Sequence, residues 1–161
     1  MVLSQTVDRT FMILFFVTGL IIFAICESSF NYINEKCTDS AIQDGLTAIA
    51  TISAVMMTMA LSYFICGWNG TCYSEGQLDT KSEVYLITFG IISLTLFLTL
   101  LVVGIKISKS SVCKGTAVGT SFEDGKQLEV NVWSMFSFAT LMLISSGFGI
   151  FYMFTKKVKN S

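Results

Sequence analysis

The feature that most constrains this chain is a set of four long apolar runs that contain no Asp, Glu, Lys or Arg. They cover residues 10–26, 45–66, 84–105 and 132–155 and are 17 to 24 residues long. A helix needs about 20 apolar residues to cross a bilayer, whereas the strands of a membrane barrel are about ten residues long and alternate polar with apolar side chains. The runs therefore predict an all-α integral membrane protein with four transmembrane helices in an up-down bundle.

Composition agrees with a chain whose surface faces lipid. Only 13% of the 161 residues are charged and 53% are hydrophobic, whereas a soluble domain carries about 25% charged residues. The length suits one domain, and we find no repeat and no low-complexity tract. We therefore predict a single four-span transmembrane domain over residues 1–161, with short or irregular connectors at 27–44, 67–83 and 106–131.

The first apolar run also fits a second interpretation. Arg9 precedes it and residues 24–26 (Ala-Ile-Cys) make a passable cleavage site, so the run has the features of a secretory signal peptide. A lipid-modified Cys26 fits less well, because Ile25 is large where a small residue is expected. We interpret the run as a true span and keep the signal peptide as the alternative.

The positive charges of the connectors are the usual guide to orientation, because Lys- and Arg-rich flanks stay in the cytoplasm. Four spans put both termini and connector 67–83 on one side. The basic residues divide equally: Arg9, Lys81, Lys156, Lys157 and Lys159 lie on the terminal side, and Lys36, Lys106, Lys109, Lys114 and Lys126 on the other. The lysines directly after the last run, and the larger number of acidic residues on the opposite side, favour cytoplasmic N- and C-termini.

The cysteines also sort by side of the membrane. Cys37 and Cys113 lie in connectors on the same side, so a disulfide between them would join these connectors if that side is oxidising. Cys66 and Cys72 bracket a turn on the other side. A single bilayer normally has one oxidising face, so the two bridges are not expected together, and five reduced thiols are the alternative.

A glycosylation sequon stands directly after the second run. Asn69 begins the sequence Asn-Gly-Thr, which matches the N-glycosylation acceptor pattern. It lies close to the membrane and on the side that we place in the cytoplasm. We therefore expect Asn69 to carry no glycan.

A face of small side chains runs along the second apolar run and consists of Ala50, Ala54, Thr58 and Ser62. Small residues let two helix backbones approach closely, and hydroxyl groups add hydrogen bonds across such a contact. We predict that this small-residue face is a close helix–helix contact. Ile52 and Met56, on the far side of the same helix, are then expected to face lipid.

Aromatic residues lie near the ends of the spans, where Trp and Tyr commonly anchor a helix at the membrane–water interface. The residues that we predict as interfacial anchors are Tyr63, Trp68, Trp133 and Tyr152. An aromatic cage for a ligand is the weaker interpretation, because these residues are spread along the chain.

The residue types that are absent restrict the chemistry. The chain has no histidine and therefore lacks the commonest general base and metal ligand. No carboxylate lies inside a span, as a proton-carrying subunit would need, and no Cys-x-x-Cys pair is present. A net charge of −1 gives no basis for nucleic-acid binding. We expect no enzyme activity, cofactor, metal or small-molecule substrate.

Two functions remain. The first is a non-catalytic structural or assembly subunit of a larger membrane-embedded complex, such as a supercomplex, a junction or the membrane–capsid layer of a virion. Its partners would be the lipid bilayer and other membrane subunits or copies of itself. The alternative is a homo-oligomeric channel or pore lined by Thr and Ser, although transport paths usually also carry ionisable residues.

Overall fold

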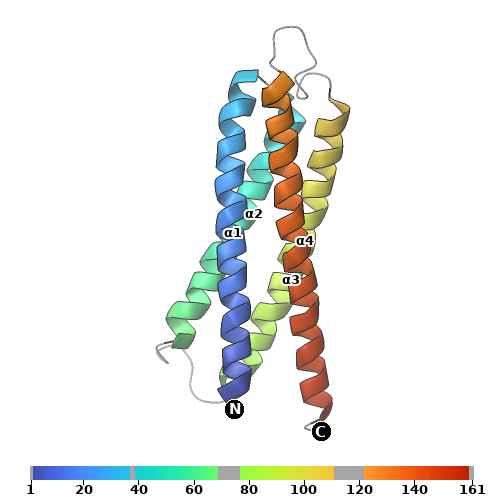
Figure 1. Ribbon diagram of the computed structural model, residues 1–161. Helices are drawn as coiled ribbons and strands as arrows, with labels where there is room; N and C mark the ends of the chain where they lie inside the picture. The colour runs from blue at the N-terminus through green and yellow to red at the C-terminus, as the bar shows by residue number, and fades with distance from the viewer. Residues whose placement is uncertain (1, 37–38, 69–76, 111–121, 160–161) are drawn as a thin grey trace.

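Four long helices form the protein, in a computed structural model that describes residues 2–36, 39–68, 77–110 and 122–159. The helices are α1 (Val2–Lys36), α2 (Ser40–Trp68), α3 (Gln77–Lys109) and α4 (Phe122–Lys159). They run alternately up and down, so both termini lie at one end of the bundle (Figure 1). We call this the terminal end and the other the opposite end. The predicted all-α four-helix bundle is confirmed.

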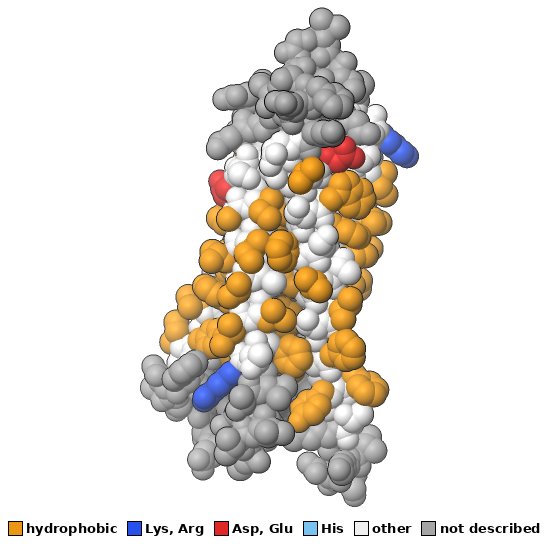
Figure 2. Space-filling model, in the orientation of Figure 1, with side chains coloured by type: hydrophobic (Ala, Val, Ile, Leu, Met, Phe, Trp, Pro, Cys, Tyr) orange, Lys and Arg blue, Asp and Glu red, His pale blue; other side chains and the backbone are white. Residues whose placement is uncertain are grey.

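Each helix contains a segment long and apolar enough to cross a membrane. These segments are Arg9–Phe30, Ser40–Ile65, Val84–Lys109 and Gln127–Tyr152. The described charged side chains gather near the two ends of the molecule, and hydrophobic side chains cover the band between them (Figure 2). This is the surface of a multi-pass membrane protein, whose middle is solvated by lipid.

The helices extend well beyond the apolar runs, so the expected boundaries of the connectors were wrong. Residues 27–44 were expected to connect two spans, but α1 continues to Lys36 and α2 begins at Ser40. Asp39 caps α2, because its side chain accepts a hydrogen bond from the backbone N–H of Ala41 at 3.0 Å. A polar sequence without proline has no reason to leave the helix at the membrane surface.

The core of the bundle follows a seven-residue repeat in every helix. The buried positions of α2 are Ile42, Leu46, Ile49, Ser53, Met56, Ala60 and Tyr63, and those of α3 and α4 recur in the same way at steps of three and four residues. Such spacing is typical of the side-by-side packing of helices in four-helix bundles. The stacked rings of Phe15 and Phe89, 4.7 Å apart, link α1 to α3 across this core.

The helices form a closed ring in which α1 packs on α2 and α4, and α3 packs on the same two helices. Glycines bring neighbouring helices close together. A Cβ atom on Gly19 would lie 3.2 Å from Met57 of α2, and one on Gly90 would lie 3.0 Å from Ile150 of α4. At Gly45 a Cβ would overlap the side chain of Val103. Small residues therefore determine how near these helices approach.

The contact at Gly45 yields a stability prediction. Replacing Gly45 with Leu should separate α2 from α3 and destabilise the bundle by about 1–3 kcal/mol through overpacking. The control is Gly147→Leu, because a Cβ at Gly147 meets no atom within 4 Å. That change should be neutral or stabilise by about 0.5–1 kcal/mol, because glycine is a poor helix former. Thermal unfolding in detergent compares the two, and equal midpoints would rule out the close contact.

Candidate functional site

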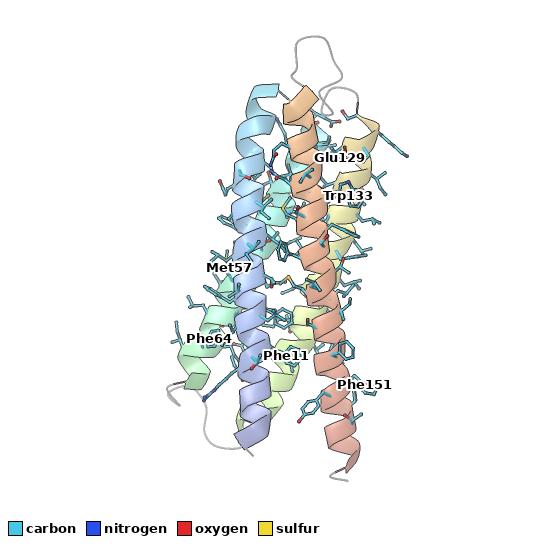
Figure 3. All side chains as sticks on the ribbon, in the orientation of Figure 1. Phe11, Met57, Phe64, Glu129, Trp133 and Phe151 are labelled. Carbon is cyan, nitrogen blue, oxygen red and sulfur yellow. The ribbon has the colours of Figure 1, made fainter. Side chains whose placement is uncertain are left out.

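Polar side chains join the helices at the opposite end of the bundle. Asn131 of α4 donates a hydrogen bond to the Ser29 hydroxyl of α1 at 3.2 Å. The Ser108 hydroxyl of α3 donates to the carboxylate of Glu129 on α4 at 3.0 Å. Figure 3 shows Glu129 near this end of α4. These two hydrogen bonds connect α4 to α1 and to α3 at the opposite end of the bundle.

Two further polar contacts involve α2. The Cys26 thiol donates to the backbone carbonyl of Leu46 at 3.2 Å, near the opposite end. At the terminal end the hydroxyls of Ser62 and Tyr85 lie 3.4 Å apart and link α2 to α3. Cys26 is buried and free. Cys37 and Cys113 lie outside the described residues, so their disulfide stays a prediction.

Hydroxyl side chains on the outside of the bundle are bonded to their own helices. The hydroxyl groups of Thr51 on α2, Thr95 on α3 and Ser137 on α4 donate to the backbone carbonyl four residues earlier, at 2.8 to 3.0 Å. Such a bond lets a polar side chain face lipid without an unsatisfied donor. Exposed hydroxyls on this surface are therefore compatible with the membrane.

The predicted small-residue face does not coincide with the buried face of α2. Ala50, Ala54 and Ser62 are half-buried, and Thr58 is exposed. The interior is instead filled from the adjacent positions, among them Met56, which is fully buried. The expectation that Met56 faces lipid was wrong. Whether the face as a whole contacts another helix stays a prediction.

A second line of small residues, which shares Ala54 and Thr58 with the predicted face, lies on the outer side of α2. Thr47, Thr51 and Thr58 are exposed, and Ala54 between them is half-buried. Their spacing of four, three and four residues places them on one straight line along the helix. We call these four residues the outer α2 face. Leu61 and Ile65 continue the line with large side chains toward the terminal end.

The predicted interfacial anchors have different environments. Trp133 and Tyr152 expose 39% and 40% of their surfaces, as anchors would. Tyr63 exposes only 5% and packs edge-on against Tyr85, with ring centroids 5.4 Å apart. Its ring is thus part of the contact between α2 and α3. The side chain of Trp68 lies outside the described part of the structure.

The buried polar side chains of the described residues are all hydroxyl groups. The buried polar side chains are Thr18, Ser29, Ser53, Ser93 and Ser146. Within the described residues, no group of three or more His, Cys, Asp or Glu side chains could hold a metal ion.

The Ser29–Asn131 contact yields a prediction about helix association. A double-mutant cycle with Ser29→Ala and Asn131→Ala should give a coupling of about 0.6 kcal/mol, the average for a hydrogen bond between membrane helices. Ser28 is the control, because its hydroxyl donates to the Ile25 carbonyl as that of Ser29 does, but it is exposed and is not the acceptor of the Asn131 hydrogen bond. The cycle of Ser28→Ala with Asn131→Ala should give a coupling near zero. Equal couplings in the two cycles, measured by unfolding in detergent, would refute the contact.

Comparisons with known proteins return no relative. No protein-family model, no curated protein and no solved structure matches the chain.

Proposed function

We propose that this chain is a non-catalytic structural or assembly subunit of a larger membrane-embedded complex. Its four spans would hold it in the bilayer, and its outer α2 face would contact a helix of another subunit. The core supports a packing role, because side chains such as Phe15, Phe89 and Met56 occupy the space between the helices.

The outer α2 face is the observation that carries this proposal. Lipid solvates large apolar side chains as well as a protein neighbour does, so lipid exposure gives no reason for small ones. A neighbouring helix, by contrast, gains dispersion contacts when its backbone comes close. The α3 surface around Thr95 has the larger exposed side chains Ile91 and Leu98, whereas the exposed apolar neighbour of Thr51 and Thr58 on α2 is the smaller Val55. The larger α3 side chains would keep a partner backbone farther away.

The threonines of the same face also support the alternative, a homo-oligomeric pore. Copies arranged around an axis would present Thr47, Thr51 and Thr58 to the centre, where hydroxyl groups could contact water. Their hydroxyls are already bonded to their own helix, however, and pore linings usually add ionisable residues. We therefore favour the contact with a partner helix.

Substitution on the outer face tests the proposal. Thr58→Leu should reduce retention of the partner by about tenfold, because overpacking costs about 1–3 kcal/mol at a close contact. The midpoint of unfolding of the isolated chain should not change, since Thr58 is exposed. Thr95→Leu on α3 is the matched control and should retain the partner. Unchanged retention by the Thr58 variant in mild detergent would disprove a close contact on this face.

The composition of the purified assembly separates the two functions. A structural subunit should elute from a gel-filtration column in mild detergent with other membrane proteins. A pore would elute as a ring that contains only copies of this chain. We expect the mixed assembly, and a ring of identical copies would favour the pore.

We further propose that the N- and C-termini face the cytoplasm. The lysines that follow the last span and the acidic residues of the opposite side support this orientation. An impermeant maleimide applied to intact cells under reducing conditions should label Cys37 and Cys113 but not Cys72. Labelling of Cys72 alone would reverse the orientation.

A further inference from the structure

A groove runs along the surface of α4 near the opposite end of the bundle. Glu129, Val130, Trp133, Ser134 and Ser137 line it. It starts just inside the span Gln127–Tyr152 and descends toward the middle of the membrane. The residues from 129 to 137 correspond to about 12 Å along the helix axis. The groove therefore connects the membrane–water boundary with the hydrocarbon.

The indole of Trp133 forms a fixed wall of this groove. The ring packs against α3 at Gly104, where an added Cβ would lie at an ordinary contact distance of 3.6 Å from its Cζ2 atom. Phe136 packs edge-on against the indole with centroids 5.5 Å apart. Figure 3 shows Trp133 on α4 below Glu129, on the side toward α3. The ring is thus held in place while 39% of the residue stays exposed.

The mouth of the groove carries a carboxylate, and the neighbouring helix α3 carries an exposed lysine. One oxygen of Glu129 accepts the hydrogen bond from Ser108, which holds the carboxylate beside α3. The second oxygen takes no part in that bond. Lys109 follows Ser108 in the chain and is exposed. A carboxylate and an indole ring on α4 and a lysine on α3 therefore lie near the ends of the two membrane-spanning segments Gln127–Tyr152 and Val84–Lys109.

We propose that this groove binds a zwitterionic phospholipid with a primary ammonium headgroup, of the phosphatidylethanolamine type. The ammonium donates to the second oxygen of Glu129 and lies against the ring of Trp133, where the negative face of the indole attracts a cation. The phosphate faces Lys109. One acyl chain follows the groove past Ser134 and Ser137, whose short side chains leave room for it.

The chemistry of the mouth distinguishes this lipid from other common ones. A quaternary ammonium group, as in phosphatidylcholine, has no N–H to donate to Glu129. An anionic headgroup without an ammonium would be repelled by the carboxylate. This site goes beyond the proposed structural role and does not depend on it, since lipid binding involves α3 and α4 and not the outer α2 face.

Quenching of tryptophan fluorescence by lipids with brominated acyl chains tests the site. The full chain with Trp68→Phe, which leaves Trp133 as its single tryptophan, is placed in bilayers of phosphatidylcholine mixed with either phosphatidylethanolamine or phosphatidylglycerol. One lipid at a time carries the bromine. Brominated phosphatidylethanolamine should displace phosphatidylcholine with a preference of about threefold, which corresponds to one charge-assisted or cation–π contact. Equal quenching by both lipids, or a preference for brominated phosphatidylglycerol, would overturn the proposal.

Variants of the mouth complete the experiment. Glu129→Gln still accepts the Ser108 hydrogen bond but loses the charge, so the preference should disappear while the fold persists. Asp44→Asn, an exposed carboxylate at the start of α2, is the matched control and should keep the preference. Ser137→Leu should fill the groove and weaken quenching by either lipid. A preference that survives Glu129→Gln, or that Asp44→Asn also removes, would contradict binding at this site.

Discussion

The hydrogen bonding of the backbone in hydrocarbon controls the rest of this structure. Lipid offers no donor or acceptor, so each span must satisfy its own N–H and C=O groups as a helix. The same requirement extends to the side chains. Exposed hydroxyls such as those of Thr51 and Thr95 donate to their own helices, and bonds between helices, such as Ser29 to Asn131, lie toward the ends of the spans.

Once the helices have formed, their association depends on how closely their surfaces fit together. Apolar side chains gain little by leaving lipid for a neighbouring helix, so close packing supplies much of the attraction. Gly19, Gly45 and Gly90 allow that closeness inside the bundle, at contacts with α2, α3 and α4 respectively. The outer α2 face has the same steric character, but three of its four side chains are exposed. This exposure is the physical reason for the proposal that the protein belongs to a larger assembly.

The sequence predicts well where the spans lie in the chain. It predicts poorly which side of each helix faces the core. Four runs without charge are unmistakable because a charge in hydrocarbon is costly. The buried side of each helix carries no such signal, since both core and lipid accept Met, Leu and Phe. The small-residue face was therefore placed beside the true core, and Met56 was assigned to lipid although it is fully buried. The buried residues of α2 recur at steps of three and four. This spacing is not visible in the sequence, because nearly all positions of the span are apolar.

The central claim is that the outer α2 face meets another protein within the membrane. Photo-crosslinking in the native membrane tests this most directly, with a benzophenone amino acid in place of Thr58 and, as a reference, in place of Thr95. We expect position 58 to form an adduct with a second polypeptide and position 95 to react mainly with lipid. Lipid adducts alone at position 58 would contradict the claim, because they would show that the outer α2 face is an ordinary lipid-exposed surface.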